Sequence, residues 1–201
     1  MDFVEDIETL ETLYGAVPKA AQVKVTPCLT DTYRRWIMAS RFSVLSTVGP
    51  EGTDGSPRGD EGPVVTELDP YTLAMPDWHG NNRMDSLRNI VRDGRVSLMF
   101  MVAGSTTAVR VNGTAKLTTD EALRARFEHK GRLPATVIVI AISEVYAQCA
   151  RALIRSELWT TDDQSAGLPT PGEILADATQ GAEGGEAYDR AWPARAATSM
   201  W

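Results

Sequence analysis

Histidine, cysteine and long apolar runs are scarce in this chain of 201 residues. The two histidines, His79 and His129, have no further candidate ligands close by in sequence, so we expect no bound metal. The two cysteines, Cys28 and Cys149, lack metal-ligand spacing and are expected to be reduced thiols of a cytoplasmic protein. The longest apolar run, residues 137–142, is too short to span a membrane, and the acidic N-terminus does not resemble a signal peptide.

Basic side chains are outnumbered, because 20 lysines and arginines face 27 aspartates and glutamates for a net charge of -7. This balance argues against nucleic acid as a partner, since such proteins need a basic surface. The sequence also lacks a Gly-x-Gly-x-x-Gly fingerprint after a strand, a Walker phosphate loop and a Gly-x-Ser-x-Gly elbow. No residue stands out as a general acid or base, so the catalytic residues are not identified. An anionic ligand would have to be held by a few local arginines.

About six stretches have the alternating apolar pattern of β-strands, and most are joined by short turns. They cover residues 42–48, 64–68, 71–76, 95–102, 107–117 and 135–146, with a bulge expected at Asn112-Gly113. Regular alternation of strands with helices, which a wound parallel sheet needs, is missing. Six antiparallel strands without an obvious edge strand favour closure of the sheet into a barrel, which removes exposed edges. We therefore expect a mainly β (α+β) fold, a six-stranded antiparallel split β-barrel with short peripheral helices.

Two segments are predicted to make up the chain. Residues 1–161 would form the barrel domain, with N-terminal helices within residues 1–40, and residues 162–201 a C-terminal extension. Within the extension we expect a linker after Asp162, a short helix at 173–178 and a flexible stretch at 181–185. The aromatic residues Tyr188, Trp192 and Trp201 are more than a solvated tail needs. The extension is thus expected to pack on the barrel or on a partner subunit.

The stretch Gly55 to Asp60 is the first of three arginine-bearing patches. Its two glycines allow the backbone to approach a ligand closely, and Pro57 fixes its own φ. The planar fork of Arg58 suits a phosphate group. The alternative is a polar turn with a solvated arginine.

The second patch, residues 81–86, begins an expected helix over 83–91, where unpaired N–H groups favour an anion. Asn82 is the candidate N-cap and Arg83 adds a positive fork, although an ordinary cap with a surface arginine fits equally well. The third patch, residues 149–159, follows the last strand and ends in Trp159. Its alternative is a helix packed on the end of the barrel.

The order of these motifs resembles the FMN-binding split-barrel proteins related to pyridoxamine 5'-phosphate oxidase, from about Phe42 to Trp159. The motifs that carry the resemblance are Ser56–Asp60, Leu73–Asp77, Asn82–Ile90 and Arg95–Phe100. Within that family the chain looks most like the branch with Ser-Pro-Arg-Gly-Asp and a late Arg-Ser-x-Leu-Trp, here residues 155–159. The oxidase's own C-terminal substrate segment is not seen, so the resemblance supports FMN binding more than vitamin B6 oxidation.

The resemblance implies a site for FMN. Arg58 and Arg83 would hold the phosphate, with Ser86 reaching it from the first helical turn behind Asn82. The ribityl chain or ring edge would be lined by Ser56, Pro57, Gly59 and Asp60. The isoalloxazine ring would meet backbone groups of Met75, Pro76 and Asp77. Arg155 and Trp159 would come from the other subunit.

The resemblance therefore predicts a homodimeric FMN-dependent oxidoreductase that acts on a small-molecule redox substrate, with NADH or NADPH as candidate reductants. One alternative is a non-catalytic protein that stores or senses flavin or another phosphorylated cofactor. Another is a structural barrel with a hydrophobic pocket and no cofactor.

Overall fold

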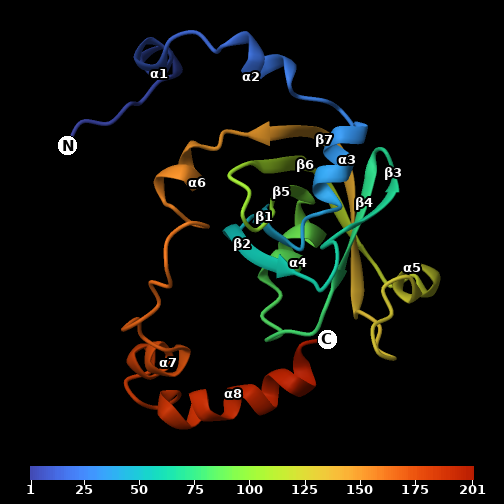
Figure 1. Cartoon of the computed structure of the whole chain (residues 1–201), viewed down its shortest axis with the longest axis vertical. Coiled ribbons are helices and arrows are strands. Elements are labelled where there is room, and N and C mark those ends of the chain that lie inside the picture. Colours follow the sequence, from blue (N-terminus) through green and yellow to red (C-terminus); the bar gives the residue numbers. More distant parts are fainter.

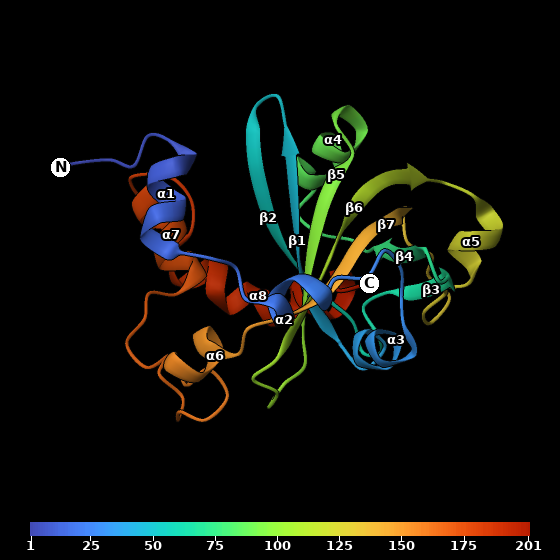
Figure 2. The same ribbon diagram turned by 90° about the horizontal axis from the view of Figure 1, so that it is seen from above.

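The computed structural model describes residues 1–201 and places seven strands in one antiparallel sheet. The strands are β1 (Phe42–Gly49), β2 (Gly52–Gly59), β3 (Thr66–Asp69), β4 (Thr72–Asp77), β5 (Arg95–Met101), β6 (Ala108–Thr118) and β7 (Thr136–Gln148). Their order in the sheet is β2-β1-β5-β6-β7-β4-β3. Figures 1 and 2 show how the sheet curls from β2 on one side to β3 on the other. The mainly antiparallel β architecture is thus confirmed.

The predicted six-stranded closed barrel is wrong in two respects. The stretch that contains Gly55 to Gly59, which was not counted among the six expected strands, is itself a strand, β2, which pairs with β1 from Phe42↔Gly59 to Gly49↔Gly52. The sheet is also open, because β2 and β3 occupy its two edges and do not pair with each other. β2 was missed because it has few of the β-branched and aromatic residues that mark strands. An edge strand tolerates Pro57, since one side of its backbone needs no ladder donor.

Eight helices surround the sheet. They are α1 (Ile7–Tyr14), α2 (Lys19–Val23), α3 (Asp31–Ile37), α4 (Asp85–Arg92), α5 (Glu121–Ala125), α6 (Arg151–Arg155), α7 (Pro171–Ala178) and α8 (Gly185–Ser199). Thr30 caps α3 by accepting a hydrogen bond from Tyr33 N at 3.3 Å, and Asp120 caps α5 by accepting from Leu123 N at 2.8 Å. No helix combines the length and apolarity that a membrane span requires.

The hydrophobic core lies inside the curl of the sheet. Fully buried side chains alternate along the strands, as period-two patterning requires, and include Leu45, Leu98, Phe100, Val109, Val111, Ile138 and Ile140. Ile37 of α3 and Ile90 of α4 complete this core. α4 is also fixed to β1 by a buried hydrogen bond of 3.1 Å from Asn89 Nδ2 to Thr47 Oγ1. This contact places the start of α4 beside β2, where the candidate site lies.

The two ends of the chain lie outside this core. No residue of α1 or α2 is buried, and α1 stands away from the sheet in both views (Figures 1 and 2). Residues 155–171 form an exposed connection to α7 and α8, which pack against each other. Thr170 forms a capping box with Glu173, and Asp189 of α8 accepts hydrogen bonds from Gly172 N and Thr170 Oγ1. The stretch from residue 185, where no helix was expected, is therefore a long helix that brings the C-terminus back to the sheet (Figure 1).

The expected bulge at Asn112-Gly113 is confirmed, and it generates a stability prediction. A Cβ atom at Gly113 would lie 2.0 Å from the carbonyl oxygen of Ala141 on β7. Gly113→Ala should therefore lower the free energy of unfolding by about 1–3 kcal/mol, as overpacking does. Gly55→Ala is the matched control in β2, because its Cβ meets nothing within 4 Å and the change should stay within about 0.5 kcal/mol. Urea unfolding measures both, and equal midpoints would contradict the prediction.

Candidate functional site

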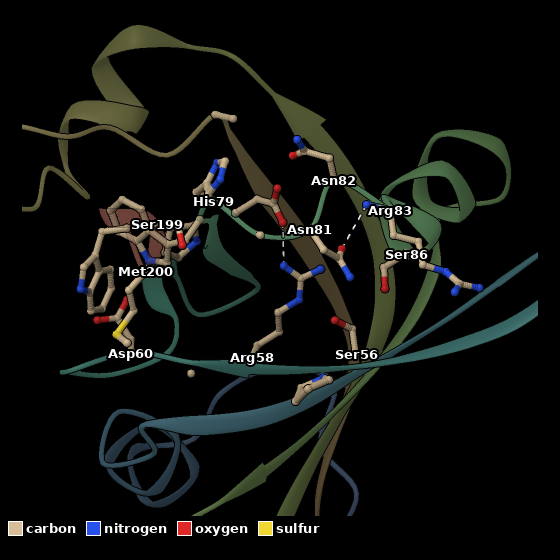
Figure 3. Close-up of a pocket in the computed structure, with 18 of the residues that line it drawn as sticks. Ser56, Arg58, Asp60, His79, Asn81, Asn82, Arg83, Ser86, Ser199 and Met200 are labelled. Carbon is tan, nitrogen blue, oxygen red and sulfur yellow. Dashed lines mark hydrogen bonds and ion pairs between the residues drawn. The ribbon is translucent and has the colours of Figure 1, made fainter. Parts of the chain in front are cut away.

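One large cavity of about 1600 Å³ lies at the open side of the sheet. Its walls come from β2, the end of β4, the loop that leads into α4, residues 132–135 and α8. It is lined by every residue predicted to bind the cofactor except Arg155 and Trp159, namely Ser56, Pro57, Arg58, Gly59, Asp60, Met75, Pro76, Asp77, Asn82, Arg83 and Ser86. Figure 3 shows the polar side chains of this set around the cavity. The tertiary structure thus brings three separate sequence segments to one place.

Arg58 lies at the centre of the cavity wall and forms an ion pair with Asp77. Its Nη1 is 2.6 Å from Asp77 Oδ1, and the two side chains are only 18% and 15% exposed. The Nε atom of Arg58 is buried and has no hydrogen-bond partner. A guanidinium carries five N–H donors, so the pair with Asp77 leaves donors for a ligand. The expected free fork is therefore partly occupied by Asp77.

The Arg58–Asp77 ion pair and a second side-chain contact connect the two sides of the open sheet. Arg58 belongs to the edge strand β2, whereas Asp77 ends β4, next to the other edge. Beyond these strands, Trp78 Nε1 donates a hydrogen bond of 3.0 Å to Asp60 Oδ2. Side chains thus bridge a gap across which no backbone ladder exists.

The start of α4 differs from the prediction. The helix begins at Asp85 and its N-cap is Met84, with φ of 61°, so the predicted start at Arg83 and cap at Asn82 are wrong. Asn82 is itself in the left-handed region, with φ of 58°, which interrupts the helical backbone before residue 85. The side chain of Asn81 accepts a hydrogen bond of 3.1 Å from Arg83 N and stabilises this turn.

Arg83 and Ser86 have different environments at this helix start. Arg83 is 78% exposed and its guanidinium bonds to Asp85, which raises the pKa of Arg83 above its usual value. Ser86 is buried and donates a hydrogen bond to the carboxylate of Asp54 on β2. Of the two predicted phosphate ligands, Arg58 is therefore the more enclosed and Arg83 the more solvated.

The end of β4 offers backbone groups to the cavity. β4 pairs with β7 along its length, from Thr72↔Ala141 to Asp77↔Thr136. Its pairing with β3 stops at Ala74, so residues 75–77 have no strand partner on that side. The contact of these backbone groups with a flavin ring stays a prediction.

Arg155 and Trp159 do not reach the cavity of their own chain. Arg155 ends α6 and is exposed, and Trp159 Nε1 donates a hydrogen bond of 2.9 Å to Ser105 O. Their contribution to a partner's cavity stays a prediction.

The wall formed by α8 and the residues that hold it were not predicted from the sequence. Trp201 stacks on His129 at a centroid distance of 4.3 Å and meets the edge of Trp78 at 5.2 Å. Arg132 Nη1 donates hydrogen bonds of 2.8 Å to Thr198 O and Trp201 O. The aromatic content of the extension was the only sequence feature that indicated packing, and it does not indicate which surface the extension contacts.

A family comparison identifies the domain that holds the cavity. The family model described as pyridoxamine 5'-phosphate oxidase matches residues 29–149, which is more than half of the chain. The chain belongs to the pyridoxamine 5'-phosphate oxidase family. The matched residues include β2, β4 and α4, whereas α8 lies beyond them. No curated protein matches the chain.

Several solved structures are similar to this family member. A candidate pyridoxamine 5'-phosphate oxidase from Lactobacillus delbrueckii is 28% identical, with a TM-score of 0.48 over 60% of this chain and 95% of the other. General stress protein 26 from Bacillus anthracis is 17% identical, with a TM-score of 0.45 over 57% and 88%. An FMN-binding protein from Syntrophomonas wolfei is 12% identical, with a TM-score of 0.45 over 71% and 97%. The family assignment itself rests on the family model.

The contacts of Trp201 predict how firmly α8 is held. Each aromatic pair contributes roughly 0.5–1.5 kcal/mol, so Trp201→Ala should speed amide hydrogen exchange in α8 by roughly five- to a hundredfold. Trp192→Ala is the matched control on the same helix, because Trp192 is 58% exposed and stacks on no other ring. Mass spectrometry of peptides from residues 185–199 measures the rate. Equal exchange in the two variants would show that these rings do not hold the helix.

Proposed function

We propose that this protein binds FMN in the cavity and acts as a flavin-dependent oxidoreductase of the Ser-Pro-Arg-Gly-Asp branch of the family. The observation that carries the proposal is the buried Nε of Arg58, which has no partner and lies in the wall of a cavity. An orphaned, enclosed guanidinium donor suits a phosphate oxygen. The name of the similar Syntrophomonas wolfei protein, which is described as FMN-binding, points the same way.

The residues present fit the parts of FMN. Arg58 would donate to the phosphate while Asp77 keeps the guanidinium in place, and Arg83 would add a second, solvated donor. Gly55 leaves open space beside β2, so the ribityl chain can approach the backbone there. The unpaired side of residues 75–77 would face the polar edge of the ring.

When bound, the flavin would supply the redox chemistry, and the protein would bind it, orient it and exclude water. NADH or NADPH would serve as reductant and a small molecule as acceptor. Cys28 and Cys149 are free thiols, which supports a reducing, cytoplasmic setting. The second candidate function is flavin storage or sensing without turnover.

Replacing Arg58 tests the phosphate site. Because a hydrogen bond to a charged group contributes about 1.5–3 kcal/mol, Arg58→Ala should weaken FMN binding roughly ten- to a hundredfold. Fluorescence titration of the apoprotein measures the affinity. Asp77→Asn controls for loss of the ion pair, and Arg95→Ala controls for loss of an arginine, since Arg95 is 69% exposed and pairs with Asp93. Arg95→Ala should retain FMN, and Asp77→Asn should weaken binding less than Arg58→Ala does, because an amide oxygen can still accept from the guanidinium. Wild-type affinity in Arg58→Ala would place the phosphate elsewhere.

Riboflavin and FAD provide a further comparison. FMN should bind the wild-type protein more tightly than either, and its advantage over riboflavin should disappear in Arg58→Ala. Equal affinity of the wild-type protein for FMN and riboflavin would remove the role of the arginine. Anaerobic titration of the loaded protein with NADH and NADPH then separates an enzyme, whose flavin is bleached, from a storage protein.

We further propose that the protein is a homodimer. The isolated chain exposes 13396 Å², whereas a compact monomer of its mass exposes roughly 9,300 Å². Exposed apolar side chains contribute to this surplus, notably Phe3, Ile7, Leu13 and Tyr14 at the N-terminus and Ile154 in α6. An obligate interface of about 2,000 Å² or more would cover part of it. Arg155 and Trp159, which do not reach the cavity of their own chain, would then contribute to the partner's cavity.

Light scattering coupled to size exclusion tests the dimer. The mass should be twice the 21.9 kDa of one chain. Removal of residues 1–25 should shift the equilibrium toward the monomer while leaving the core intact, because none of these residues is buried. A monomer at all concentrations that still binds FMN with full affinity would contradict both the dimer and a shared site.

A further inference from the structure

The cavity is larger than one cofactor requires. Its volume of about 1600 Å³ exceeds the roughly 300–1,000 Å³ typical of a small-molecule site. Figure 3 shows Arg83 and Ser86 at one end and Ser199 and Met200, at the end of α8, toward the other. The proposed phosphate site occupies the end of the cavity at Arg83 and Ser86 and its middle, at Arg58. The wall formed by α8 is therefore available to a second ligand.

One face of α8 is directed at this space. Tyr188, Trp192, Arg195 and Ser199 follow each other at helical spacing, and all four line the cavity. The guanidinium of Arg195 lies 4.0 Å from the centre of the Tyr188 ring and 5.8 Å from that of Trp192. The side chain of Trp192 is 58% exposed although it lines a cavity. An aromatic surface next to a cation is thus open to a ligand.

Arg195 has no counterion. Its Nη2 donates a hydrogen bond of 3.1 Å to Tyr188 O, while its Nε is buried without a partner. The acidic side chains nearest in sequence are engaged elsewhere, because Asp189 binds Gly172 and Thr170 at α7, and Glu186 pairs with Arg190. A partly buried cation without an anion is costly, and an anionic ligand would relieve that cost.

We propose that α8 forms a second compartment of the cavity, which binds a planar aromatic molecule that carries an anionic group. Arg195 binds the anion, and Trp192 provides the surface on which the ring stacks. This inference rests on the proposed function, because a flavin-dependent oxidoreductase must bind its substrate beside the flavin. The substrate class would then be aromatic carboxylates or sulfonates.

A pair of probes that differ only in charge tests the proposal. 2-Naphthoate and its neutral amide, 2-naphthamide, are titrated calorimetrically into the apoprotein and into the FMN-loaded protein. The naphthoate should bind the wild-type protein roughly ten- to a hundredfold more tightly than the amide. Arg195→Gln should remove this difference and leave amide binding and FMN affinity unchanged, whereas Arg195→Lys should retain part of it. Trp192→Ala should weaken both probes.

Arg190→Gln is the matched control, because Arg190 lies on the same helix, is 71% exposed and pairs with Glu186. It should bind both probes as the wild-type protein does. Equal affinity of the wild-type protein for the two probes, absence of naphthoate binding, or equal effects of Arg195→Gln and Arg190→Gln would overturn the proposal. If FMN fails to bind but naphthoate binding by the apoprotein still depends on Arg195, the compartment stands and the flavin assignment falls.

Discussion

The open sheet is the constraint on which the rest of this structure depends. β2 and β3 are edges that do not pair, so the two sides of the curled sheet are joined by side chains instead of a backbone ladder. The Arg58–Asp77 ion pair and the Trp78–Asp60 hydrogen bond form this connection. A backbone ladder would have filled the gap, whereas polar side chains leave a cavity lined by donors and acceptors. The feature that leaves the sheet incomplete is therefore the one that gives it a candidate site.

Charge is distributed unevenly between this cavity and the rest of the protein. The chain carries a net charge of -7, yet the cavity encloses guanidinium groups whose Nε atoms lack partners, those of Arg58 and Arg195. A local positive potential of this kind can select an anionic ligand while the overall charge disfavours polyanions. Asp77 limits the cost of enclosing Arg58, whereas nothing comparable faces Arg195. The proposed cofactor site and the proposed second compartment rest on these two guanidinium groups, which line different parts of one cavity.

The strongly patterned parts of the fold could be predicted from local sequence. Alternating apolar residues identified β1 and β5–β7, and the Asn112-Gly113 bulge followed from residues that interrupt a strand. Helices were expected within residues 1–40, and α3, with Thr30 as its cap, is one of them. The motifs around Arg58 and Ser86 were found because their residue types suit a phosphate, and the motif around Met75 was found through the family resemblance. The fold brings all three to one cavity.

Local sequence predicted where most strands and the arginine-bearing motifs lie, since periodicity and residue chemistry are local properties. The tertiary structure was needed to establish that residues 52–59 pair with β1 as an edge strand, because their glycines and proline carry no strand preference of their own. It also decided that Asp77 faces Arg58 and that α8 walls the cavity through Trp201. These contacts join residues far apart in the chain, and their energies depend on burial and geometry that no local pattern encodes.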